Sequence, residues 1–176
     1  MKARYKEDKA VQIAALLLEK EGNKMNYTKL IKLMYVVERR SLIKRGVPIT
    51  FDNLYSLDNG PILSLTLDNI NGQTYSQEST LWSQFISKLE QEKYSVYLIK
   101  SPGIGKLSRA EVKLVNEVYE ELGHMTYGQL ISWSHNPRNI PEWQDPNGSS
   151  IPIKLCDILG SEGYSDDAIA SDSIYQ

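Results

Sequence analysis

The first quarter of the chain repeats apolar residues at helical spacing. From residue 5 to residue 21 these residues fall three and four positions apart, which places them on one face of a helix. Gly22 follows as a C-terminal cap. A second apolar stripe occupies residues 27–45, with Asn26 as a side-chain N-cap and Gly46 as a stop signal. The pattern therefore predicts two helices joined by a short turn.

The middle of the chain mixes extended and helical patterns. Residues 54–57 have the length and apolar character of a short strand, and residues 94–99 are rich in β-branched and aromatic side chains. Asn59–Gly60–Pro61 is a corner that we expect to start a further helix, because proline is tolerated in the first helical turn. Residues 76–92 again repeat apolar positions at helical spacing, which predicts another helix.

Two capping boxes mark helix starts in the second half. Ser108 and Glu111 have the S-x-x-E spacing in which each side chain accepts a hydrogen bond from an exposed N–H of the first turn. The helix that they open is predicted to end at Leu122. Thr126 and Gln129 form a second box and open a shorter helix.

Together these elements predict a mainly α fold of the α+β class. We expect a single compact helical domain with a small two- to three-stranded antiparallel sheet, since 176 residues suffice for one domain with a core. This domain is expected to span residues 1–165. A last helix is expected to start at Ser165, and residues 166–176 are predicted to be an acidic, frayed tail.

Composition excludes membrane and secreted classes of protein. The 41% hydrophobic and 24% charged residues are ordinary for a globular protein. No apolar run approaches the ~20 residues that span a bilayer. The N-terminus lacks the apolar region and cleavage site of a signal peptide. We therefore expect a cytoplasmic protein without a membrane partner.

Few residues of this chain are suited to catalysis or metal binding. The single cysteine, Cys156, excludes an intramolecular disulfide and a Cys-rich zinc site, and two histidines leave little for a histidine site. Nucleophile-elbow, phosphate-loop and zinc-protease motifs are absent from the sequence. The only candidates for acid–base catalysis in the sequence are His135 and the nearby Glu142 or Asp145. The sequence therefore predicts no enzyme, no cofactor and no metal.

Charge is distributed unevenly along the chain. Residues 1–45 carry 12 Lys/Arg and 5 Asp/Glu, a net charge of +7, whereas the rest carries −9 and the whole chain −2. Two interpretations remain open. The two halves pair within the fold, or a basic face meets an acidic or phosphate-bearing partner. The acidic whole disfavours nucleic acid as that partner.

Five features, in this order, resemble one known family. They are Lys29–Tyr35 (KLIKLMY), the Gly46–Val47–Pro48 exit of the second helix, the Asn59–Gly60–Pro61 corner, the Leu107–Ser108 helix start, and His135 followed by Trp143. Over about residues 8–160 the chain resembles the Panacea domain, the family of SocA-like antitoxins and phage-associated proteins.

The resemblance implies an antitoxin of a toxin–antitoxin system that neutralises a cognate toxin by direct protein–protein binding. One relative acts as a proteolytic adaptor, so a cytoplasmic protease is a second partner that the resemblance allows. The alternatives are a phage-derived protein that binds a host factor, and a nucleic-acid-binding regulator that uses the basic N-terminal helices.

The resemblance and the charge pattern together select ten partner-binding candidates. The exposed basic face of helix 27–45 is the first place where we expect a partner. Each candidate also has a structural interpretation: a solvated lysine, a packed tyrosine with a hydrogen-bonded hydroxyl, a corner, a hydrogen-bonded histidine or a core tryptophan. The candidates are Lys29, Lys32, Tyr35, Arg39, Arg40, Asn59, Gly60, Pro61, His135 and Trp143.

Overall fold

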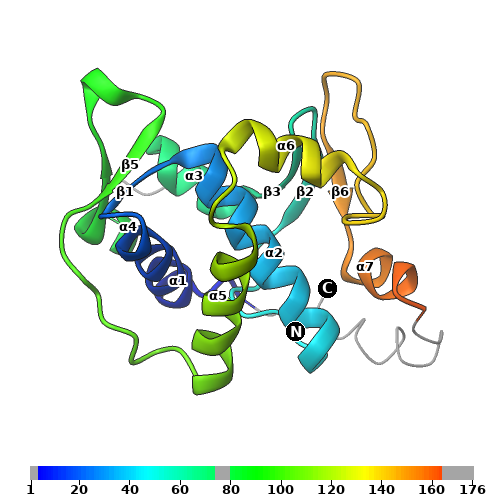
Figure 1. Ribbon diagram of the computed structural model, residues 1–176, viewed down its shortest axis with the longest axis horizontal. Coiled ribbons are helices and arrows are strands. Elements are labelled where there is room, and N and C mark those ends of the chain that lie inside the picture. Colours follow the sequence, from blue (N-terminus) through cyan, green and yellow to red (C-terminus); the bar gives the residue numbers. More distant parts are fainter. Residues whose placement is uncertain (1–3, 74–79, 164–176) are drawn as a thin grey trace.

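The computed structural model describes residues 4–73 and 80–163, which form a helical body with a small sheet at each of two opposite ends (Figure 1). Both sheets are antiparallel and three-stranded, and the described residues include seven α-helices. This confirms the α+β class and the dominance of helices, but adds a second sheet to the single sheet that we expected.

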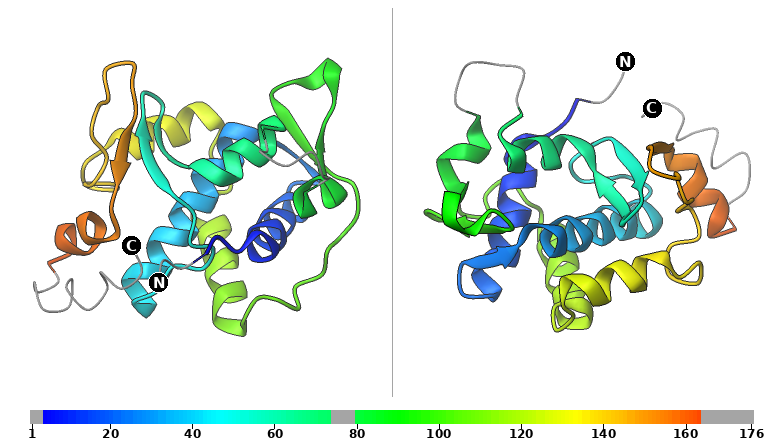
Figure 2. Two further views of the ribbon diagram at one scale, coloured as in Figure 1. Left: turned by 180° about the vertical axis from the view of Figure 1, so that it is seen from behind. Right: turned by 90° about the horizontal axis from the view of Figure 1, so that it is seen from above.

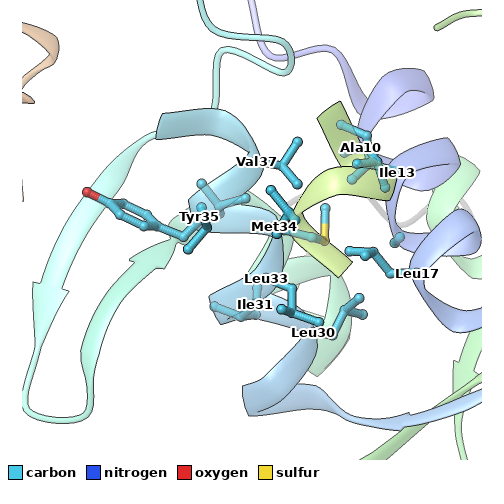
Figure 3. Close-up of a cluster of buried hydrophobic side chains, with 14 of the residues drawn as sticks. Ala10, Ile13, Leu17, Leu30, Ile31, Leu33, Met34, Tyr35 and Val37 are labelled. Atoms are coloured by element: carbon cyan, nitrogen blue, oxygen red, sulfur yellow. The ribbon is translucent and has the colours of Figure 1, made fainter. Parts of the chain in front are cut away.

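Helix α2 (Tyr27–Arg45) forms the centre of the body and packs against α1 (Glu7–Lys20), α5 (Arg109–Leu122) and α6 (Tyr127–His135). Thirteen of its nineteen residues are buried, which identifies a central helix rather than an amphipathic surface helix. Figure 3 shows apolar side chains of α1 meeting those of α2, while Tyr35 points to the opposite side.

The first sheet carries the strands in the order β1 (Lys24–Asn26), β5 (Ser95–Leu98) and β4 (Ile86–Lys88). Strand β1 directly precedes α2, so this sheet is anchored to the N-terminal end of the central helix. Ile86 of β4 and Val96 of β5 are buried in the core, and β5 contacts α1. Helix α4 (Leu81–Phe85) leads into β4, and a 3₁₀ turn η1 (Glu90–Glu92) joins β4 to β5.

The second sheet has the strand order β3 (Gly60–Leu63), β2 (Leu54–Leu57) and β6 (Ile151–Ile153). Strands β2 and β3 form a hairpin, with Leu57 opposite Gly60. Helix α3 (Ser64–Asn71) follows the hairpin, and α7 (Leu155–Ser161) follows β6. This sheet lies against the face of α2 that Tyr35 occupies.

Several local predictions are confirmed. Helix α2 has the predicted bounds, and the Asn26 side chain accepts hydrogen bonds from the N–H groups of Thr28 and Lys29. Both capping boxes are formed, and α5 ends at Leu122 as predicted. These signals act within one helical turn, so they depend little on the rest of the fold.

The prediction that Asn59–Gly60–Pro61 starts a helix is wrong. Asp58 and Asn59 form the turn of the β2–β3 hairpin, and Pro61 lies in β3, opposite Ser56. Strand β3 is an edge strand, where a proline needs no ladder N–H. The next helix starts only at Ser64.

The prediction of one helix over residues 76–92 is wrong over residues 86–92. Helix α4 ends at Phe85, and Ile86 pairs with Leu98 across the β4–β5 ladder. The apolar spacing of residues 86–92 fits either a helix or a strand. Pairing with β5 makes residues 86–88 a strand. The predicted helix start at Ser165 and the predicted tail 166–176 lie outside the described residues.

Candidate functional site

Polar residues recur along α2. Lys32, Tyr35 and Arg39 lie on the side that faces the hairpin and the C-terminal loops, and Lys29 lies near the ends of α1 and α5. Lys29, Lys32 and Arg39 have exposed fractions of only 9%, 3% and 8%, and Tyr35 is fully buried between them. The interpretation of Lys29 and Lys32 as solvated side chains is therefore wrong, and so is the expectation of an exposed basic face at these three positions. Their partners come from distant parts of the chain, which the spacing within α2 does not reveal.

At the C-terminal half of α2, the buried residues Tyr35, Arg39 and Glu142 form a hydrogen-bonded network with the exposed Glu162. We call these four residues the Arg39 network. Tyr35 Oη donates to Glu142 Oε1 at 2.7 Å, and Arg39 Nε donates to the same oxygen at 2.7 Å. Arg39 Nη2 reaches Glu142 Oε2 at 3.2 Å and Glu162 Oε1 at 2.7 Å. Burial, together with the Glu142 carboxylate, raises the pKa of Tyr35 well above its usual value. The sequence interpretation of Tyr35 as a packed, hydrogen-bonded tyrosine is confirmed.

In the N-terminal half of α2, Lys32 has fewer hydrogen-bond and ion-pair partners than Arg39 among the described residues. Its Nζ donates to the Pro61 carbonyl oxygen at 2.9 Å, and no carboxylate pairs with it among the residues that the structure describes. Burial lowers the pKa of Lys32 from 10.5 to about 7. Lys29, one turn earlier, differs because it pairs with Glu21 and donates to the Gly123 carbonyl at 2.6 Å.

Gly60 explains how the hairpin can cover Lys32 so closely. Its φ of +102° lies in a region that side-chain-bearing residues rarely adopt. A Cβ at this position would lie 2.9 Å from Lys32 Nζ and closer still to Ser134 Oγ. The corner therefore needs glycine for two reasons, its backbone conformation and its contact with α2 and α6.

A cavity of about 350 Å³ lies beside Lys32, between the N-terminal part of α2, the hairpin and α3. Its volume falls in the range of small-molecule sites. Apolar side chains form much of its wall, and polar side chains stand among them. The lining includes Thr28, Ile31, Lys32, Leu57, Asn59, Ile62, Leu67 and Asn71.

His135 and Trp143 meet at the other side of the hairpin. Their rings stack with centroids 4.3 Å apart, and Trp143 Nε1 donates to the Leu57 carbonyl at 2.9 Å. Trp143 thus packs against the core and ties the 136–150 loop to the hairpin. His135 Nε2 is buried without a hydrogen-bond partner within the described ranges, so the structural hydrogen bond expected of His135 is not seen at this atom. Glu142 is committed to the Arg39 network and forms no hydrogen bond with His135 among the described contacts.

The outer basic residues of α2 pair with glutamates of α5. Arg40 contacts Glu121 at 2.5 Å, and Lys44 lies 3.4 Å from Glu117. The positive N-terminal segment is therefore matched by acidic residues of the second half. Of the two interpretations of the charge split, these contacts favour pairing within the fold.

The sequence did not indicate the exposed apolar side chains on the segment from Ile86 to Ile99, which we call the β4–β5 arm. Leu89, Tyr94 and Ile99 expose 48%, 59% and 58% of their surface. Leu89 falls within the helix predicted over residues 76–92, and its exposure follows from the end of α4 at residue 85. Figures 1 and 2 show the arm as the green segment at one end of the molecule.

Two further features are absent from the described residues, a metal-binding cluster and a membrane-spanning helix. No group of three His, Cys, Asp or Glu residues within 4–73 and 80–163 is placed to hold a metal ion. Over the same ranges, every helix is too short or too polar to cross a membrane.

Comparison with known families gives one match. The family model described as "Antitoxin SocA-like, Panacea domain" matches residues 30–144, well over half of the chain. The matched range includes most of α2, the hairpin and the Glu142–Trp143 segment. No curated protein and no solved structure matches the chain.

Proposed function

We propose that this chain, which belongs to the SocA-like Panacea antitoxin family, neutralises a cognate toxin by binding it directly in the cytoplasm. The family match carries this proposal. The role is non-catalytic, and it needs a rigid scaffold with an exposed contact surface. The closed core around α2 supports the first requirement, and the β4–β5 arm supports the second.

The β4–β5 arm is the surface that we assign to the toxin. Protein interfaces are enriched in aromatic residues, and their anchors cluster where they can be fully desolvated on binding. Tyr94, Leu89 and Ile99 are exposed apolar side chains of one short segment. Strand β4 is also an edge strand, so its free backbone groups offer hydrogen bonds to a partner.

The ten sequence candidates divide into two groups under this proposal. Asn59 is exposed at the hairpin turn and Arg40 is half-buried, so both are available for a partner. Interior candidates such as Lys29, Tyr35 and Arg39 would support binding through the fold rather than by contact. Nucleic acid is not the proposed partner, because the basic side chains of α2 other than Lys32 already pair with glutamates.

The direct test is co-expression with the product of the neighbouring gene, followed by co-purification. A stable complex should bury roughly 1,200–2,000 Å² in total. Ile99→Asp is expected to abolish the complex and the rescue of growth. Ile104→Asp is the matched control, because Ile104 has an exposed fraction of 48% but lies outside the arm. Circular dichroism of both variants checks that each is folded.

Two outcomes would count against the proposal. Absence of both rescue and complex with the unmodified chain would remove the toxin as partner and favour a host factor instead. Equal loss of binding in the two variants would remove the arm as the contact surface. The half-life of the toxin in cells separates masking, which leaves it unchanged, from delivery to a cytoplasmic protease, which shortens it.

A further inference from the structure

Lys32 differs from the other buried charges of the core in how few partners it has. Glu38 accepts hydrogen bonds from the Thr50 N–H, the Thr50 hydroxyl and the Phe51 N–H. Asp52 accepts from the Leu65 and Thr66 N–H groups and from the Thr66 hydroxyl. Each of these carboxylates thus accepts several hydrogen bonds that favour its charged form, although burial still raises the pKa of both groups.

Within residues 4–73 and 80–163, Lys32 forms a single hydrogen bond, to the Pro61 carbonyl, although an ammonium group carries three donors. Only 3% of its surface is exposed, and it lines the cavity of about 350 Å³ under the hairpin. An isolated charge is strongly disfavoured in a protein interior unless an opposite charge joins it or the group loses its proton. The structure therefore places an incompletely paired cation at the wall of an accessible cavity.

The walls of the cavity define what kind of anion would fit. Ile31, Ile62 and Leu67 provide apolar contact area for an organic body, and Asn59 and Asn71 provide polar groups beside it. One buried ammonium balances one negative charge. The carboxylate of Asp58, which also lines the cavity, disfavours a doubly charged phosphate.

We propose that this cavity is a binding site for a small organic monocarboxylate, whose carboxylate is held by the ammonium group of Lys32 and whose apolar body lies on Ile31, Ile62 and Leu67. The site is separate from the β4–β5 arm and does not depend on the toxin proposal. Binding completes the donor set of Lys32 and joins α2, the hairpin and α3 through one ligand.

Protonation makes the site sensitive to pH. Burial lowers the pKa of Lys32 to about 7, so the ammonium form decreases through neutral pH. The other titratable groups that line the cavity are Tyr27 of α2 and Asp58 of the hairpin turn, and Asp58 Oδ1 already accepts from the Gly148 N–H at 2.9 Å. Apparent affinity follows the competent fraction, so it should fall about a hundredfold from pH 6 to pH 9.

The test uses hexanoate as the probe and hexanamide as its neutral analogue, with binding followed by NMR of the full chain labelled with ¹³C at lysine Cε. Hexanoate is expected to shift the Lys32 signal and raise its titration midpoint, whereas hexanamide is not. Lys32→Met should weaken hexanoate binding at least tenfold. Lys44→Met is the matched control on the same helix, because the Lys44 side chain is 58% exposed, and it should bind as the unmodified chain does.

The pH series on the unmodified chain keeps the test independent of how well the Lys32→Met variant folds. Equal binding of hexanamide and hexanoate, or affinity that is constant from pH 6 to pH 9, would overturn the proposal. Tighter binding of inorganic phosphate than of hexanoate would overturn the assignment to a monocarboxylate. Shifts that appear only at lysines other than Lys32 would show that the anion binds elsewhere.

Discussion

The two halves of the polar face of α2 show opposite solutions to burying a cation. In the C-terminal half, Arg39 is held by two glutamates, and Tyr35 shares one of them. In the N-terminal half, Lys32 has one carbonyl partner in the part of the chain that the structure describes, and a cavity lies beside it. The difference teaches that a buried cation stabilises the fold where its partners are built into the chain, and that it creates a binding site where they are not.

Lys29 sharpens the comparison because it is the same residue type one turn away from Lys32. It has a carboxylate partner, Glu21, and a second acceptor, the Gly123 carbonyl. The residue type and the helix are therefore not what distinguishes the two positions. Lys29 and Lys32 differ because different loops close over their side chains.

The largest effect on stability is expected from removing Glu142 from the Arg39 network. Glu142→Ala leaves the Tyr35 hydroxyl without its acceptor and Arg39 with only the more exposed Glu162. We expect the free energy of unfolding to fall by about 3–5 kcal/mol, the usual effect of removing one partner of a buried pair. Urea denaturation measures it. Glu162→Ala is the control and should change stability by less than about 1 kcal/mol; a similar loss in both variants would contradict the network as described.

Adding a side chain at Gly60, beside Lys32, should have the next largest effect on stability. Gly60→Ala places a Cβ against Lys32 Nζ and Ser134 Oγ at a φ of +102°. The expected destabilisation is about 2–3 kcal/mol, from strain and overpacking together. Gly148→Ala is the control, since Gly148 also has a positive φ, +81°, but open space around it. Thermal denaturation of both variants separates the two contributions, and an equal shift in melting temperature would exclude the close approach as a cause.

The pH dependence of stability should distinguish the two lysines. The folded-state pKa of Lys32 is lowered from 10.5 to about 7, so between these pH values the unfolded chain binds more protons and stability rises with pH. From pH 7 to pH 9 the unmodified chain should gain about 2 kcal/mol that Lys32→Met does not gain. Urea titrations at several pH values measure this difference.

Lys29→Met is the matched control for that experiment. It removes the partner of Glu21, so it should lower stability, while keeping the rise with pH that Lys32 causes. Identical pH profiles for the unmodified chain and Lys32→Met would show that Lys32 keeps an ordinary titration in the folded protein.

The smallest effect on stability should come from removing one hydrogen bond of the Arg39 network while keeping its ion pairs. Tyr35→Phe removes one hydroxyl and leaves both Arg39–Glu142 contacts in place. A loss of about 1 kcal/mol is expected, as for a single intramolecular hydrogen bond. Calorimetry can resolve a change of this size; a loss as large as that of Glu142→Ala would mean that the hydroxyl organises the whole network.

The sequence predicted the local part of the fold well. The bounds of α2, its Asn26 cap and the two capping boxes depend on neighbours within a few residues. It failed at the corner before Pro61 and over residues 86–92, where a strand partner elsewhere in the chain decides the outcome. Apolar spacing in such short segments fits both a helix and a strand.

For the candidate site, the sequence identified residues but not their surroundings. Lys32, Tyr35, Gly60 and Trp143 all lie where α2 meets the hairpin, which their selection did not predict. The sequence offered a packed interpretation of Tyr35 and Trp143, but it did not predict the burial of Lys32 or the exposed β4–β5 arm. A pattern of charge along α2 gives spacing on a helix, but it does not say which other segment covers that face.

The sequence by itself determined where the main helices begin and end, because caps, stops and periodicity act over one or two turns. It also carried the family resemblance. Only the tertiary structure decided that Arg39 is enclosed by Glu142 and Glu162 while Lys32 faces a cavity. Those partners lie more than a hundred residues from Arg39, and the free energy of a buried charge depends on the groups that surround it in space.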